Sequence, residues 1–205
     1  MIERTMNNPR LVVATLLALA LGACQRSPAP GQEAPLAGAR IGGPFTLVDQ
    51  DGKPFSSEAL KGRYAVVYFG YTYCPDVCPT DMLTLAKGLK TFEAQDSARA
   101  AKILPVFISV DPARDTPPVL KQFVGAFHPR MIGLTGTDTQ IAAVAKEYAT
   151  TFEKVKPEPG VEGYLMQHMS TAILFGPKGE PIALVPVDLK DGGAGVAETF
   201  ARWVR

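Results

Sequence analysis

The sequence has few of the residues that would indicate a disulfide framework or a nucleic-acid partner. Among 205 residues there are three cysteines, two histidines and one tryptophan, with 21 Lys and Arg against 20 Asp and Glu. Three cysteines are too few for a disulfide-rich scaffold, and a chain of this length can bury a core without one. A net charge of +1 provides no basic field for phosphates, so the composition excludes nucleic acid as a partner.

The apolar run near the N-terminus is too short to span a bilayer as a mature helix. Residues Leu11–Leu21 follow Arg4 and Arg10, and a helix needs about 20 apolar residues to cross. A basic start and a short apolar run are typical of a signal peptide. The run ends in Leu21-Gly22-Ala23-Cys24, which resembles the lipobox of bacterial lipoproteins. We expect residues 1–23 to be a lipoprotein signal peptide and Cys24 to carry the lipid; the alternatives are an uncleaved anchor or a secretory signal with an incidental cysteine.

Residues 24–40 are rich in Pro, Gly and Ala and show no apolar periodicity. This composition is typical of a flexible tether. We therefore expect one folded domain over residues 41–205, held near a membrane by lipid-modified Cys24.

Strand and helix patterns alternate along this domain. Continuous apolar runs at 64–69 and 103–110 predict strands buried on both faces, and a short strand is expected at 131–134. Residues 45–55 predict an N-terminal hairpin, and 171–185 a second one. Helical periodicity is found over 82–92, 116–127, 138–148 and 196–204. The polar stretch 151–163 is expected to be a loop or an irregular hairpin. The order predicts a single, three-layer α/β domain of the thioredoxin-like type.

Two thiols lie between the first buried strand and its helix, in Cys74-Pro75-Asp76-Val77-Cys78-Pro79. Because proline disfavours helical angles in the preceding residue, the pair is expected in a constrained loop, with the helix beginning about Pro79. Unpaired N–H groups at a helix N-terminus favour thiolate over thiol, whereas an ionised Asp76 would oppose it.

Three interpretations of the pair compete: a structural disulfide, a dithiol redox centre and a soft-metal site. A disulfide across so short a loop would constrain the unfolded chain little. A metal site needs another ligand, and His168, just before the predicted strand at 171, is the candidate. Two thiolates and one imidazole suit copper, whereas a structural zinc site has four ligands. The alternative for His168 is a hydrogen-bonded core histidine. We expect His128, at a helix C-terminus, to lie on the surface.

These motifs resemble those of the Sco/SenC family of copper-binding, cytochrome c oxidase assembly proteins. The segments that carry the resemblance are YFGYTYCPDVCPT at 68–80, ISVDPARDTP at 108–117, IGLTG at 132–136 and YLMQH at 164–168. The resemblance implies a thioredoxin-like fold with an inserted loop before the ligand histidine. It also implies that Cys74, Cys78 and His168 bind Cu(I) and Cu(II), and that the protein acts at the periplasmic face of a bacterial membrane.

The implied partners are the copper-site subunit of cytochrome c oxidase and a periplasmic thiol reductase or copper donor. The alternative function is a thiol–disulfide reductase in which Cys74 and Cys78 form the redox-active pair and act on cysteines of an oxidase subunit. General thioredoxins have Cys-x-x-Cys preceded by tryptophan, and the one tryptophan here is Trp203.

The sequence departs from the family beside the histidine. Gln167 precedes His168 where family members commonly have aspartate, and Met169 follows it. Loss of a partner that orients a metal-bound imidazole costs about 10- to 100-fold in affinity or activity. Altered copper affinity is therefore expected. Arg114, in the segment after the second buried strand, is expected either to pair with a carboxylate or to contact a docking partner.

Overall fold

A computed structural model describes residues 32–156 and 163–205. The predicted signal peptide, Cys24 and the first residues of the predicted tether lie outside the described residues. The strands are β1 Thr46–Asp49, β2 Pro54–Ser56, β3 Tyr64–Gly70, β4 Ile103–Ser109, β5 Ile132–Thr135, β6 Phe152–Val155, β7 Leu165–His168, β8 Ala172–Phe175 and β9 Pro181–Val185. The helices are the 3₁₀ turn η2 Ser57–Leu60, α2 Val77–Gln95, α3 Ser97–Ala100, α4 Pro117–Phe127, α5 Asp138–Glu147 and α6 Ala194–Trp203.

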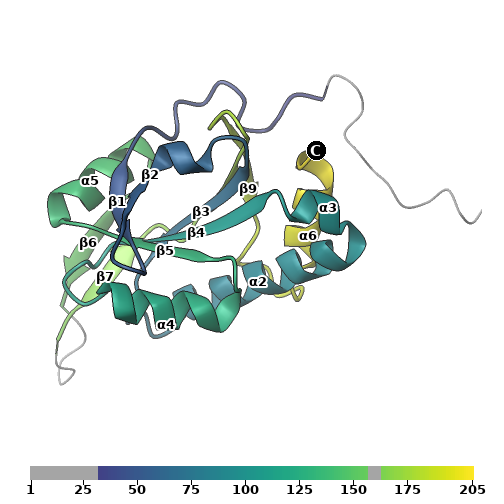
Figure 1. Ribbon diagram of the computed structural model, residues 1–205. Coiled ribbons are helices and arrows are strands. Elements are labelled where there is room, and N and C mark those ends of the chain that lie inside the picture. The colour runs from purple at the N-terminus through teal and green to yellow at the C-terminus, as the bar shows by residue number, and fades with distance from the viewer. Residues whose placement is uncertain (1–31, 157–162) are drawn as a thin grey trace, which may run out of the picture.

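A seven-stranded mixed sheet forms the centre of the domain, in the order β2-β1-β5-β4-β3-β8-β9 (Figure 1). Strand β3 pairs in parallel with β4 and antiparallel with β8. Every residue of β3 and β4 is buried, as their continuous apolar runs predicted. Strands β6 and β7 form a separate two-stranded sheet.

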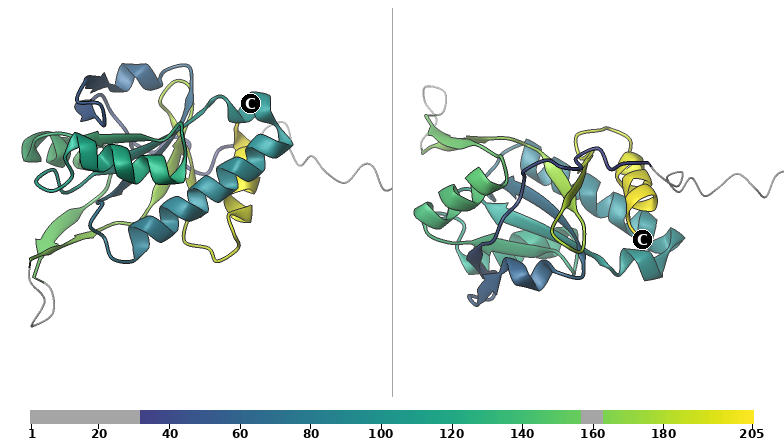
Figure 2. Two further views of the ribbon diagram at one scale, coloured as in Figure 1. Left: turned by 60° about the horizontal axis from the view of Figure 1, so that its bottom comes forward. Right: turned by 90° about the horizontal axis from the view of Figure 1, so that it is seen from above.

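Helices cover both faces of the large sheet, which confirms the predicted three-layer, thioredoxin-like α/β architecture (Figures 1 and 2). On one face, Tyr68 of β3 bonds to Asp81 of α2, and Phe107 of β4 packs on Phe123 of α4. Helix α6 packs beside α2 on this side. On the other face, Phe69 packs on Tyr148 at the end of α5. Among the helices of residues 32–156 and 163–205, none is both long and apolar enough to cross a membrane.

The start of one helix differs from the prediction, and the structure decides between the two alternatives stated for 151–163. Helix α2 begins at Val77 rather than about Pro79, so Cys78 lies in its first turn, while Cys74 remains in the preceding loop. Pro79 is tolerated in the first turn of α2, because the N–H groups of a first turn have no partner within the helix. A proline only disfavours helical angles in the residue before it, so Cys78 can still be helical. The stretch 151–163 contains strand β6, and His168 ends β7, so the irregular hairpin, rather than a plain loop, carries the histidine.

His128 is buried, which makes the predicted surface position wrong. Only 3% of the residue is exposed, and its Nε2 lies 3.3 Å from a carboxylate oxygen of Glu93 in α2. The Arg130 backbone N–H donates to its Nδ1 at 3.2 Å, and burial lowers the pKa of the ring. The end of α4 lies against α2, and Glu93 of α2 provides a partner for His128 that the sequence around His128 does not reveal.

The described part of the segment predicted as a tether lies against the domain. The Leu36 N–H donates to the carbonyl of Ile182 in β9 at 3.0 Å, and Ala34 packs on the core. The contacts therefore begin before Ile41.

Gly88 in α2 allows the close approach of α6. A Cβ at this position would lie 2.7 Å from the Gly193 carbonyl oxygen and would overlap the Val196 side chain. We expect Gly88→Ala to lower the free energy of unfolding by about 1–3 kcal/mol, because backbone atoms cannot move aside as a side chain can. Urea denaturation would measure the change.

Gly125 in α4 is the matched control, since a Cβ there meets nothing within 4 Å. Alanine is favoured over glycine in a helix by about 1 kcal/mol, so Gly125→Ala should stabilise the domain. Equal effects of the two substitutions would contradict the close-packing account of α2 and α6.

Candidate metal centre

The two thiols lie where β3 ends and α2 begins. Cys78 is fully buried and Cys74 is partly buried. Gly70, the last residue of β3, leaves space for the Cys78 sulfur, because a Cβ at Gly70 would lie 3.0 Å from Sγ. A glycine at the end of an otherwise bulky strand thus allows one thiol to sit directly over the sheet.

The site brings together the three residues that the sequence analysis singled out. One donor atom from each of Cys74, Cys78 and His168 lies within 4.8 Å of the others, so the group could hold a metal ion. The Cys78 Sγ lies 3.2 Å from Nε2 of His168. The backbone N–H of Cys78 donates to the Cys74 sulfur at 3.4 Å. His168 is 90 residues from Cys78 in the sequence, and the fold brings its imidazole to the two neighbouring thiols at the end of β3.

His168 is oriented by backbone and by aromatic rings. Its Nδ1 lies 3.2 Å from the Met169 carbonyl oxygen. A carbonyl oxygen only accepts, so Nδ1–H donates to it, and Nε2 is the ring nitrogen that faces Cys78. The rings of Tyr68 and Tyr71 make T-shaped contacts with the imidazole, with ring centroids 6.3 and 5.8 Å away.

The departure at Gln167 has a structural explanation. Gln167 is exposed and pairs with Glu153 on β6. Because neighbouring residues of a strand point to opposite faces, the Gln167 side chain points away from the face that carries His168. The orienting bond that a neighbouring carboxylate could supply to His168 comes here from the Met169 carbonyl.

The thiols share a proton unequally. The hydrogen bond from the Cys78 thiol lowers the pKa of Cys74, and His168 and the Cys78 N–H add to this effect against the cost of burial. The same hydrogen bond to Cys74, together with burial, raises the pKa of Cys78. The directions of the two pKa shifts favour the thiolate form at Cys74 and the thiol form at the buried Cys78.

Sequence reasoning missed a buried polar pair beneath the thiols. The Tyr68 hydroxyl donates to a carboxylate oxygen of Asp81 at 2.8 Å, and 5% of Asp81 is exposed. Burial is the main cause that raises the pKa of both groups. Asp81 follows Cys78 by three residues in a helical pattern, so one turn of α2 places its carboxylate on the core side. A buried position for a charged residue is the only signal the sequence offered.

Asp115 fixes the loop that carries Cys74. Its carboxylate accepts hydrogen bonds from the Thr72 N–H at 3.0 Å and the Thr72 hydroxyl at 2.7 Å, and also from the Ser109 hydroxyl at 2.6 Å. Thr116 occupies the N-cap position of α4, and Asp115 is fully buried behind it. Asp115 therefore ties the end of β4 to the loop before the thiols.

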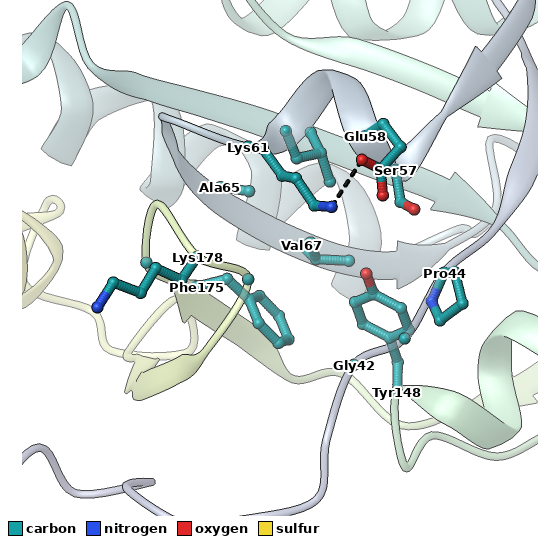
Figure 3. A pocket seen from close by; sticks show the side chains of 14 residues that line it. Gly42, Pro44, Ser57, Glu58, Lys61, Ala65, Val67, Tyr148, Phe175 and Lys178 are labelled. Carbon is teal, nitrogen blue, oxygen red and sulfur yellow. Dashed lines mark ion pairs between the residues drawn. The ribbon is translucent and has the colours of Figure 1, made fainter.

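A cavity of about 260 Å³ lies away from the thiols, against the residues Ala65 and Val67 of β3. Figure 3 shows the Tyr148 and Phe175 rings beside it, with the Lys61–Glu58 ion pair nearby. Because Val67 alternates with Tyr68 along the strand, this cavity lies on the opposite face of the sheet from Asp81 and α2. It is therefore not part of the thiol site.

The fold and the site together define a class of protein. A thioredoxin-like domain presents two free thiols and an oriented imidazole at one edge of its sheet, and the donor set could hold a soft metal ion. The SCO1/SenC family model matches residues 33–204, so the chain belongs to the SCO1/SenC family.

Individual relatives are found in bacteria and mitochondria. The chain is 43% identical over 140 residues to the mitochondrial protein SCO2 of Saccharomyces cerevisiae, covering 68% of this chain and 46% of the yeast protein. It is 43% identical over 142 residues to SenC of Rhodobacter capsulatus, covering 69% and 62% of the two chains. The chain thus spans about half the length of the yeast relative.

Solved structures support the same assignment. The structure of Bradyrhizobium japonicum ScoI with copper bound has a TM-score of 0.70 at 35% identity, covering 80% of this chain and 99% of that chain. Two structures at 26% identity have TM-scores of 0.64 and 0.57. One is a SCO1/SenC family lipoprotein from Bacillus anthracis, covering 78% of this chain and 92% of that one. The other is BsSco, a member of the Sco family of cytochrome c oxidase assembly proteins in which a disulfide switch is identified, covering 80% and 98%.

Proposed function

We propose that the protein binds copper through Cys74, Cys78 and His168 and assists assembly of the copper site of cytochrome c oxidase. The observation that carries the proposal is the convergence of two thiol sulfurs and an imidazole nitrogen within 4.8 Å. Thiolates favour Cu(I), and imidazole suits Cu(II) as well, so this donor set fits both oxidation states. Copper in this role is cargo that the site holds and releases.

The relatives support both parts of the proposal. Bradyrhizobium ScoI, a protein of the same fold and family, has been solved with copper bound. BsSco belongs to the cytochrome c oxidase assembly proteins. The partners we propose are the copper-site subunit of the oxidase and a periplasmic thiol reductase or copper donor.

The proposed location follows from the N-terminal motif. We propose that residues 1–23 are removed as a lipoprotein signal peptide, that lipid-modified Cys24 anchors the chain, and that residues 24–40 lead to the domain at 41–205. The existence of a lipoprotein in the family supports an anchor at the periplasmic face of a bacterial membrane.

The alternative function is a thiol–disulfide reductase acting on cysteines of an oxidase subunit. It is favoured by a specific observation: both thiols are free, and the pKa of Cys74 is lowered by the hydrogen bond from Cys78. A stabilised thiolate is the attacking form in thiol–disulfide exchange. Cys74 and Cys78 would then be the redox-active pair.

Copper titration of the reduced protein, without oxygen, tests the proposal. We expect one Cu(I) or one Cu(II) per chain, with sulfur-to-copper charge-transfer absorption in the Cu(II) form. His168→Ala should abolish that absorption, because it removes the one nitrogen donor of the group. An unchanged spectrum and affinity in His168→Ala would overturn the proposal.

His128→Gln is the matched control, since it removes the other histidine of the chain at a site in contact with Glu93. Its copper spectrum should match that of the unsubstituted protein. Reduction of a disulfide substrate that needs no copper and persists in His168→Ala would instead favour the reductase.

A further inference from the structure

The hairpin that carries His168 lacks strand pairing with the large sheet. In the described ranges, β6 and β7 pair with each other and form a sheet of their own (Figure 1). The hydrogen bonds that fix β3, β4 and β8 relative to one another therefore do not extend to β7. Apart from the short chain connection to Ala172 of β8, which pairs with Tyr68, the position of His168 relative to the thiols depends on side-chain contacts.

Arg114, in the loop after β4, supplies such contacts at the start of β7. One guanidinium nitrogen donates to the Tyr164 carbonyl oxygen at 3.1 Å, and Nε donates to the Asp111 carboxylate. The Tyr164 hydroxyl donates to the other oxygen of Asp111 at 2.8 Å. Tyr164 immediately precedes β7, so its bonds to Arg114 and Asp111 restrain the N-terminal end of the strand that ends in His168.

The same guanidinium also contacts the loop that carries the thiols. Its central carbon lies 3.8 Å from the ring centroid of Tyr164, 5.0 Å from that of Tyr73 and 5.6 Å from that of Tyr71. A cation over aromatic faces within about 6 Å is attracted to them. Arg114 thus lies between the thiol loop and the histidine hairpin, and Tyr71 itself packs on His168.

These contacts leave little exposed surface on the Arg114 side chain for a docking partner. Its side chain is 24% exposed and that of Asp111 is 4% exposed. The carboxylate pairing expected from the sequence is therefore present, while the guanidinium that could have faced a partner is directed into the molecule.

We propose that Arg114 is a positioning residue of the metal site, which sets the distance between His168 and the two thiols by holding Tyr164 and the thiol loop together. This inference rests on the proposed function, in which His168 binds copper. Arg114 touches none of the three donor atoms, so its effect should pass through His168. Cu(II) binding should depend on it more than Cu(I) binding, which two thiolates favour.

A double-mutant cycle with Cu(II) tests this. Affinities of the reduced protein, Arg114→Ala, His168→Ala and the double variant would be measured by competition with a chelator. We expect Arg114→Ala to weaken Cu(II) binding about 10-fold and to shift the charge-transfer band, as for loss of a residue that orients a ligand. In the His168→Ala background the same substitution should change the affinity less than about 2-fold, because coupled residues are not additive.

Two further variants separate positioning from general stability. Arg114→Lys keeps the charge near the rings but lacks the planar fork that contacts Asp111 and Tyr164 together, so it should recover only part of the Cu(II) affinity. Arg130→Ala removes an arginine that pairs with Glu93 away from the thiols. It should lower the melting temperature and leave the Cu(II) spectrum unchanged.

The outcomes are distinguishable. An Arg114→Ala loss of equal size in both backgrounds, or no loss in either while His168→Ala weakens binding, would overturn the positioning role and leave the proposed function standing. If His168→Ala itself leaves Cu(II) binding intact, the proposed function fails, and the positioning role fails with it.

Discussion

Replacing Cys78 by alanine is expected to lower the affinity of the protein for Cu(I) by more than about 100-fold. Loss of a group that merely orients a metal ligand costs about 10- to 100-fold, and Cys78 supplies one of the two sulfurs of the site. Alanine is chosen because serine would leave an oxygen beside Nε2 of His168. Competition titration with a Cu(I) chelator would measure the loss.

The fold should survive this substitution, since cysteine in a core behaves as a small apolar residue. Thermal unfolding without copper checks this point. Met82→Leu is the matched control: Met82 is a buried sulfur residue of the same helix outside the donor group, and the exchange conserves volume. It should bind Cu(I) as the unsubstituted protein does. Equal copper affinity in Cys78→Ala would contradict the assignment of the site.

The second large effect is a nearly pH-independent reaction of Cys74 with iodoacetamide. An ordinary thiol has a pKa near 8.5, so its thiolate fraction, and with it its rate, falls on the order of 1,000-fold from pH 8 to pH 5. The hydrogen bond from the Cys78 thiol lowers the pKa of Cys74, so its thiolate persists as the pH falls. We expect its rate constant to change less than about 2-fold over this range.

Peptide mass spectrometry would assign the label to Cys74, Cys78 or Cys24. Cys78 should remain unlabelled, because it is buried and its pKa is raised by its hydrogen bond to Cys74 and by burial. In Cys78→Ala the donor to Cys74 is lost, so the pKa of Cys74 should rise and the rate should fall as the pH is lowered. A steep pH dependence already present in the unsubstituted protein would contradict the shared-proton account.

The two proposed activities would use the same thiolate. Copper binding needs Cys74 and Cys78 reduced and His168 in place, whereas thiol–disulfide exchange needs only the thiols. His168→Ala should therefore impair copper binding and leave thiol–disulfide exchange intact. Loss of either cysteine would impair both activities and would not separate them.

Local patterns predicted much of the fold correctly. The apolar runs of β3 and β4 and the periodicity of α2, α4, α5 and α6 each depend on residues close in sequence, and these elements occur where they were expected. The start of α2 was misplaced because proline constrains its neighbour only weakly at a helix N-terminus. Strand β7 was not separated from the loop before it, since four residues give little periodicity.

Some properties of the candidate site could be predicted from the sequence, and others could not. The sequence by itself limited which side chains could bind a metal, because the chain has one close pair of cysteines and two histidines, but it left a disulfide, a redox pair and a metal site as alternatives. It could not determine that His128 is buried, that Asp81 lies under the thiols or that Arg114 faces inward. Those properties depend on partners 13 to 50 positions away in the chain.

Only the tertiary structure decided the geometry that makes a site of these residues. Strand β3 brings the thiols to an edge of the sheet, the β6–β7 hairpin brings His168 to within 3.2 Å of Cys78, and Arg114 lies between the two segments. The sequence determined which atoms could bind a metal, since that follows from residue type. Their convergence follows from packing between distant segments, which no local pattern encodes.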